Sequence, residues 1–147
     1  MSLTIVSGPW SDDQAREWLS EAVIPIRLAS LGTRGPLVQS LWFTFSDDVL
    51  WCATQVDSVL ARRLHGDSRV GWEISPDAPP YRGARGTGRA AVLDDRELAA
   101  DTLSQLINRY GQSGTQLATW LMSRVATEVA IRIDDLALTS WDYSPRM

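Results

Sequence analysis

The sequence predicts a mainly β fold with peripheral helices, a small antiparallel barrel of six or seven strands. Short segments of apolar or alternating character follow one another and are mostly joined by turn residues, as in hairpins. The segment 85–93 is a long strand interrupted by glycines, which indicates close backbone approach or barrel curvature. The glycines do not lie between a strand and a helix of a parallel unit, so a dinucleotide-binding fold is not indicated.

The first helix is predicted over 11–21. Ser11 and Gln14 form a capping-box pattern, and apolar residues recur behind it at helical spacing. Pro25 follows soon after and prevents the helix from continuing. The mostly apolar residues 24–31 suit a buried strand.

The next segments predict a hairpin followed by a short helix. Alternation over 37–45 predicts a strand, Ser46-Asp47-Asp48 predicts its turn, and 49–55 predicts the return strand. Asp57 or Ser58 can cap a helix that ends near Gly66.

The remaining elements rest on the same periodicities. We expect strands at 69–74, 85–93, 128–133 and 136–141, and helices at 97–110 and 114–124. Asp134-Asp135 is interpreted as a turn between the last two strands.

Composition narrows the class of protein. A length of 147 residues predicts one domain over 1–147, and a net charge of −4 argues against nonspecific nucleic-acid binding. A single cysteine, together with no secretory signal, fits a reducing cytoplasm. No stretch is long and apolar enough to cross a bilayer, so we expect no membrane partner.

A candidate anion site lies where the strand 49–55 meets the following helix. The hydroxyls of Thr54 and Ser58 can donate to phosphate oxygens, and the helix N-terminus adds backbone N–H groups. Arg62 and Arg63 follow one turn later with forked donors. The alternative is that Ser58 only caps the helix and both arginines are solvated.

A candidate ring site lies on the strand at Ser40-Leu41-Trp42-Phe43. Alternation sends Trp42 and Phe43 to opposite faces, so one can pack inside the barrel while the other meets a planar ligand or a partner subunit. Two ordinary packing aromatics are equally compatible with the composition.

Two further residues are interpreted without a catalytic role. His65, the only histidine, is expected at the surface near a helix end, and nothing supplies the other ligands of a metal site. Cys52 lies in mid-strand and is expected to be a small buried hydrophobe. No side chain is assigned as catalytic acid or base.

Taken together, the ordered segments resemble the FMN-binding split β-barrels related to pyridoxamine 5'-phosphate oxidase, in the subgroup of flavin- and deazaflavin-dependent oxidoreductases. The similar pieces are Gly35 to Phe43, Thr54 with Ser58 and Arg62, Leu64 to Val70, Pro80 to Gly88, and Ser140 to Tyr143. The resemblance covers roughly residues 11 to 143, and this chain is shorter than true pyridoxamine phosphate oxidases.

The resemblance implies a homodimer with cofactor sites at the subunit interface. The implied cofactor contacts are Ser40, Leu41, Trp42, Phe43, Thr54, Gln55, Ser58, Arg62, Arg63 and, from the partner subunit, Trp141. The implied substrate contacts are Trp72 and Tyr81. Many members of the family carry a lysine two residues after the serine, where this chain has Leu60, so cofactor phosphate binding would depend on Arg62 and Arg63.

The expected function is therefore hydride transfer to or from a small organic substrate, with FMN or the deazaflavin coenzyme F-420 as cofactor. The sequence leaves two alternatives open. One is a non-catalytic split-barrel protein that binds flavin or haem, and the other is a structural dimer with a vestigial pocket.

Overall fold

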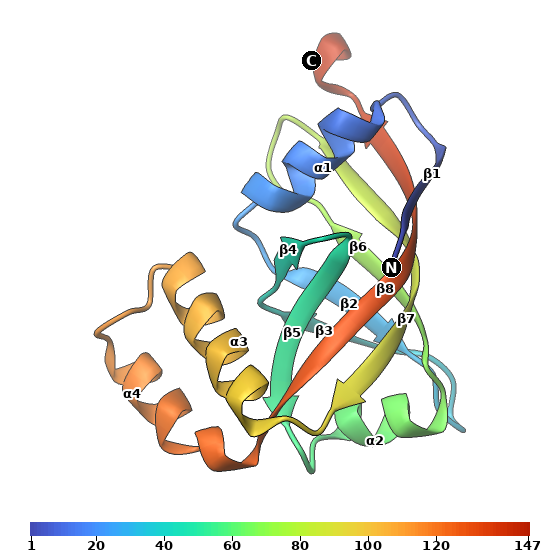
Figure 1. The fold of residues 1–147 in the computed structure, drawn as a ribbon. Coiled ribbons are helices and arrows are strands. Elements are labelled where there is room, and N and C mark those ends of the chain that lie inside the picture. The colour runs from blue at the N-terminus through green and yellow to red at the C-terminus, as the bar shows by residue number, and fades with distance from the viewer.

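The computed structural model describes all 147 residues and is built around one curled sheet (Figure 1). The strands are β1 (Leu3–Ser7), β2 (Ile26–Ser30), β3 (Leu37–Leu41), β4 (Thr44–Ser46), β5 (Val49–Gln55), β6 (Arg69–Ile74), β7 (Arg82–Leu93) and β8 (Glu128–Asp142). Seven of them form the order β3-β2-β6-β7-β8-β5-β4, in which all neighbours are antiparallel. The expected mainly β, antiparallel split barrel is confirmed.

Four α-helices surround the sheet. They are α1 (Asp12–Glu21), α2 (Val59–Gly66), α3 (Arg96–Arg109) and α4 (Gln116–Ser123), and short 3-10 turns lie at Val125–Thr127 and Ser144–Arg146. In Figure 1, α3 and α4 lie together on one side of the curled sheet, away from α1. Each predicted helix is present to within two residues at either end, with α2 starting after its cap at Ser58. None of them is long and apolar enough to cross a membrane.

The sheet differs from the expectation in three places. β1 was not predicted, and it pairs in parallel with β8, more than a hundred residues later in the chain. The expected strand 37–45 is broken into β3 and β4 around Trp42 and Phe43. The predicted turn at Asp134-Asp135 is wrong, because β8 continues through it as a bulge in which Asp135 has φ 50° and the register against β7 shifts.

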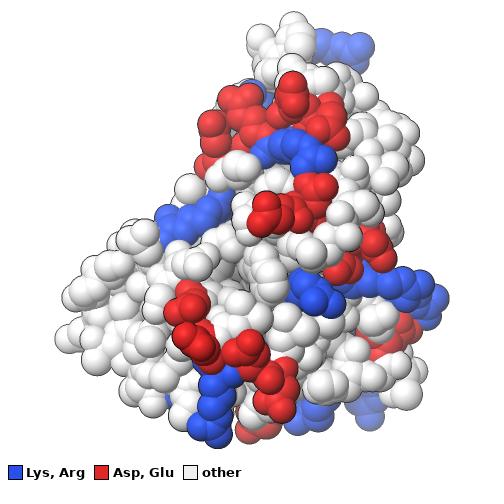
Figure 2. Space-filling model, viewed as in Figure 1, with Lys and Arg blue, Asp and Glu red and all other residues white.

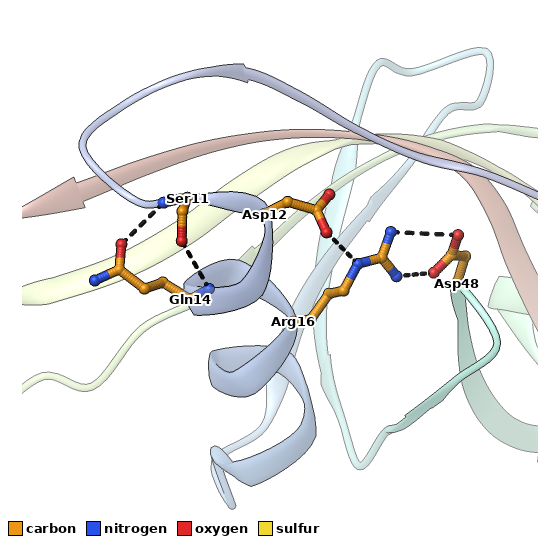
Figure 3. A network of polar contacts seen from close by, with 5 residues as sticks. All are labelled: Ser11, Asp12, Gln14, Arg16 and Asp48. Atoms are coloured by element: carbon orange, nitrogen blue, oxygen red, sulfur yellow. Dashed lines mark hydrogen bonds and ion pairs between the residues drawn. The ribbon is translucent and has the colours of Figure 1, made fainter.

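The local signals at α1 and at the β4–β5 hairpin appear as predicted. The Ser11 hydroxyl accepts from the Gln14 N–H at 3.2 Å, and the Gln14 side chain accepts from the Ser11 N–H at 2.9 Å (Figure 3). Asp47 and Asp48 both have positive φ, as the type I′ two-residue hairpin turn requires. Arg16 of α1 contacts Asp12 and also Asp48, so it joins the helix to this turn.

The main core fills the barrel, and a smaller one lies under α3 and α4. The first contains 19 buried residues, including Phe43, Leu60 and Trp72. The second consists of Leu103, Ile107 and Ala118, with Trp42 packed against it. Because α4 carries no charged residue, the surface over it in Figure 2 is uncharged, and Leu117 and Trp120 are exposed there by 43% and 53%.

Candidate functional site

An open groove of about 390 Å³ lies between the β3–β4 corner and the helices α3 and α4. Its lining residues are Pro25, Ser40, Leu41, Trp42, Ala53, Leu103, Leu106, Leu117, Leu121 and Glu128. Of these, Ser40 and Glu128 are the polar ones. The groove therefore contains three of the four residues of the predicted ring site, on a surface suited to a flat apolar molecule.

Trp42 forms one wall of the groove and is held by Tyr110, the residue after α3. The two rings are stacked, with centroids 5.1 Å apart and planes inclined by 11°. The Tyr110 hydroxyl donates to the Ile24 carbonyl oxygen at 2.8 Å and accepts from the Phe43 N–H at 3.2 Å. Burial raises the pKa of Tyr110, so its hydroxyl keeps the proton that it donates.

Arg109 stabilises the same corner. Its guanidinium donates to the carbonyl oxygens of Phe43 at 2.9 Å, Ser20 at 3.0 Å and Ala22 at 2.9 Å. It also lies 4.7 Å from the Phe43 ring centroid, within cation–π range. The end of α3 thus satisfies backbone groups of both the β3–β4 corner and the segment before β2, which makes the groove wall rigid.

Phe43 is placed differently from the rest of the predicted ring site. Its side chain is fully buried in the barrel core, and its N–H and C=O are bonded to Tyr110 and Arg109. In the protomer it therefore supports the groove from behind and offers no free polar group to a ligand. The prediction that Trp42 and Phe43 face opposite sides is confirmed by these positions.

At the far end of the groove, Gln55 contacts Glu128. The Gln55 amide nitrogen donates to Oε2 of Glu128 at 2.9 Å, and the Gln55 amide oxygen accepts from the Thr127 hydroxyl at 2.5 Å. Burial raises the pKa of Glu128, and the hydrogen bond from Gln55 partly opposes this. Thr54, on the same strand, is half-buried opposite Val129.

The predicted anion site divides into a free and an occupied arginine. Arg62 is exposed and donates from Nη1 to the Asp57 carbonyl oxygen at 2.9 Å, which leaves most of its donors free. Arg63 instead donates to Ser30 Oγ at 3.1 Å, to the Ser30 carbonyl oxygen and to that of Gly35. Arg63 is thus a structural link between α2 and the β2–β3 loop.

Ser58 caps α2, as the simpler interpretation of this junction proposed. Its hydroxyl oxygen accepts from the Ala61 N–H at 3.0 Å, which leaves the hydroxyl hydrogen available to a ligand. Leu60 is 1% exposed within the barrel core. Leu60 therefore packs in the core and does not line the cleft around Arg62.

The two predicted substrate residues lie away from the groove. Trp72 is 4% exposed and its indole N–H donates to the Thr87 carbonyl oxygen at 3.0 Å, so in the protomer it is a core residue. Tyr81 is exposed just before β7, and its carbonyl accepts from the Tyr143 N–H. Trp141 is half-buried near the end of β8, under Arg85, and does not line the groove of its own protomer.

A second cleft lies around Arg62, and within one protomer this Arg62 cleft is separate from the groove. It is lined by Leu31, Gly32, Thr33, Arg62, Arg63, Gly66, Asp67 and Arg69, none of which lines the groove. Tyr110 and Glu128 were not among the predicted site residues. Neither residue belongs to a recognisable sequence motif. They are identified as site residues only because, in the folded chain, Tyr110 stacks on Trp42 and Glu128 is hydrogen-bonded to Gln55.

Known structures share this fold. No protein-family model matches the sequence, and no curated protein matches it. The conserved hypothetical protein Rv2991 from Mycobacterium tuberculosis has a TM-score of 0.77 and 22% identity, covering 92% of this chain and 86% of its own. An F420 reductase has a TM-score of 0.70 and 22% identity, covering 83% and 94%.

Two less similar structures broaden the comparison. HutZ, the haem storage protein from Vibrio cholerae, has a TM-score of 0.66 and 18% identity, covering 86% of this chain and 92% of its own. A pyridoxamine 5'-phosphate oxidase-like protein from Listeria innocua has a TM-score of 0.57 and 15% identity, covering 74% and 81%. At these identities the likeness shows the fold alone, which is the split barrel expected from the sequence.

Proposed function

We propose that this chain is a flavin- or deazaflavin-dependent oxidoreductase that acts on a small organic molecule, with the cofactor ring in the groove beside Trp42. The observation that carries the proposal is the groove itself. It is open, mainly apolar and lined by Ser40, Leu41 and Trp42, the segment expected to meet a planar ring. The same fold occurs in an F420 reductase, which supports this choice of cofactor class.

The residues around the groove fit such a cofactor. Trp42 is already stacked on Tyr110, so its other side offers a rigid aromatic surface next to the apolar lining. Arg62 and the Ser58 hydroxyl keep free donors for a phosphate. When bound, the cofactor would supply hydride transfer, and the protein would bind the ring, orient it and exclude water from one face.

A homodimer is part of the proposal. Within one protomer the groove and the Arg62 cleft have no lining residue in common, whereas a single cofactor would need both its ring and its phosphate bound. Exposed Val38, Leu117 and Trp120 add apolar surface on β3 and α4, the elements beside the groove. A second protomer placed against this surface would bury these side chains and provide the missing walls.

The test is a titration of the purified protein with FMN and with coenzyme F-420, followed by fluorescence, after its visible spectrum has been recorded. We expect saturable binding, and reoxidation of the reduced cofactor by a substrate from a reductase panel. Failure of both cofactors to bind would refute the proposal.

A matched pair of variants tests the phosphate contact. Arg62→Ala should weaken cofactor binding by one to two orders of magnitude, roughly the ~1.5–3 kcal/mol of a hydrogen bond to a charged group. Arg146→Ala, which removes an exposed arginine near the C-terminus that lines neither cleft, should leave affinity unchanged. Equal affinities for the two variants would exclude Arg62 from the site.

The alternative is a protein that binds flavin or haem without turnover. Fold similarity to the haem storage protein HutZ supports haem. The groove is lined by no His, Cys, Met or Tyr, the side chains that commonly hold haem iron, and this favours a flavin in the groove. Tight cofactor binding with no turnover across the panel would select the non-catalytic alternative.

A further inference from the structure

Glu128 is the titratable residue that lines the groove. It is the first residue of β8, lies opposite Gln55 of β5 and is half-buried. Among the other lining residues, only Ser40 with its hydroxyl and Trp42 with its indole N–H carry a polar side-chain group. Arg124 is the neighbouring cation that acts on this carboxyl group, but it does not line the groove, so Glu128 is the ionisable group that a ligand there would meet.

The Glu128 side chain is held in place by its neighbours. Gln55 donates from Nε2 both to Glu128 Oε2 at 2.9 Å and to the Arg124 carbonyl oxygen at 3.1 Å. The Gln55 oxygen accepts from the Thr127 hydroxyl at 2.5 Å, which fixes the orientation of the amide. Gln55, expected as a cofactor contact, acts here as a positioning residue for Glu128.

The second carboxyl oxygen of Glu128 remains available. Oε2 accepts from Gln55, while Oε1 has no hydrogen-bond partner in the protomer and is not fully enclosed by protein. A half-buried carboxylate beside apolar walls is poorly hydrated, and a ligand that covers it must replace the lost water. An N–H, O–H or cationic group does so, whereas an anion would be repelled.

We propose that Glu128 determines which ligands the groove accepts, namely planar apolar molecules that present an N–H, O–H or cationic group to its carboxyl oxygen. Molecules that would place an anion there are excluded. This selectivity rests on the proposed function, in that the groove is taken to be a ligand site. For a bound cofactor it means that the phosphate points away from Glu128 and a hydrogen-bond donor of the ring or substrate points toward it.

The experiment uses three probes that share one bicyclic ring and differ only in the attached group: 2-naphthylmethylamine, 2-naphthalenemethanol and 2-naphthoate. Calorimetric titration of the full chain at pH 7 should give affinities for the amine and the alcohol at least tenfold higher than for the carboxylate. In Glu128→Gln, the carboxylate should bind within about threefold of the alcohol. Glu97→Gln, which removes an exposed carboxylate from the first turn of α3, should keep the wild-type order.

Equal affinities for the three probes in the wild type, or no binding of any probe at millimolar concentration, would overturn the inference. So would an unchanged order in Glu128→Gln with its fold retained by circular dichroism. Parallel titration with FMN and coenzyme F-420 separates this inference from the proposed function. If a cofactor binds but the order of probe affinities in Glu128→Gln is the same as in the wild type, only the role of Glu128 is refuted. If the order depends on Glu128 but neither cofactor binds, only the proposed oxidoreductase function is refuted.

Discussion

Replacing Tyr110 by Phe removes one hydroxyl and tests whether the end of α3 holds the groove wall. The ring stays stacked on Trp42, but the bonds to the Ile24 carbonyl oxygen at 2.8 Å and from the Phe43 N–H at 3.2 Å are lost. Each bond contributes about 1 kcal/mol net, and a buried Phe43 N–H without a partner adds a desolvation cost. We therefore expect the free energy of unfolding to fall by about 2–3 kcal/mol.

Urea denaturation followed by tryptophan emission measures this loss, with an unchanged m-value as the sign that the unfolding reaction is the same. Tyr143→Phe is the matched control, because Tyr143 is 53% exposed and its hydroxyl has no partner. The control should lie within about 0.5 kcal/mol of the wild type. A loss below about 0.5 kcal/mol for Tyr110→Phe would show that water replaces the hydroxyl and that the corner is held by Arg109 alone.

Three further outcomes are expected. Arg63→Ala should lower the free energy of unfolding by about 2–3 kcal/mol, because the carbonyls of Ser30 and Gly35 lose a charged donor, and urea denaturation measures it. A loss no larger than that of Arg146→Ala, which removes an exposed arginine near the C-terminus, would contradict a structural role. The Cys52 thiol, which burial keeps at a pKa of about 12, should react with a thiol reagent at pH 8 only after unfolding, and rapid labelling of the folded protein would be inconsistent with its burial. Glu128→Gln should unfold at an equal or higher temperature than the wild type at pH 7. The folded state raises the pKa of Glu128, so the wild type loses stability as pH rises through that pKa, whereas the variant has no carboxyl group to ionise. The advantage of the variant should disappear below about pH 4, near the usual pKa of glutamate. A variant less stable than the wild type at pH 7 would refute this sign.

The local elements could be predicted because their signals lie within a few residues. Ser11 and Gln14 bond each other across one turn, Ser58 caps α2 through Ala61, and Asp47-Asp48 forms the hairpin turn by itself. Hydrogen bonds of this kind need no distant partner. Alternation also placed Trp42 and Phe43 on opposite faces, although it did not say which of them would face the groove.

The different contacts of Arg62 and Arg63 could not be predicted from such local signals. Arg62 and Arg63 are adjacent and equally suited to bind an anion, yet Arg63 is bound to carbonyls about thirty residues earlier and Arg62 is not. Likewise, the parallel pairing of β1 with β8 joins the two ends of the chain. Neither outcome follows from residue type, because both depend on which segments the barrel brings together.

By itself, then, the sequence determined most of the strands, all four helices with their caps, the β4–β5 hairpin turn, and the placement of Trp42 and Phe43 on opposite faces. These depend on backbone periodicity and on hydrogen bonds between near neighbours. Only the tertiary structure decided that Phe43 and Trp72 are enclosed, that Tyr110 holds Trp42, and that Gln55 directs Glu128 into an apolar groove. The reason is that burial and the pairing of side chains distant in sequence arise from packing, which is defined only once the sheet has curled and the helices cover it.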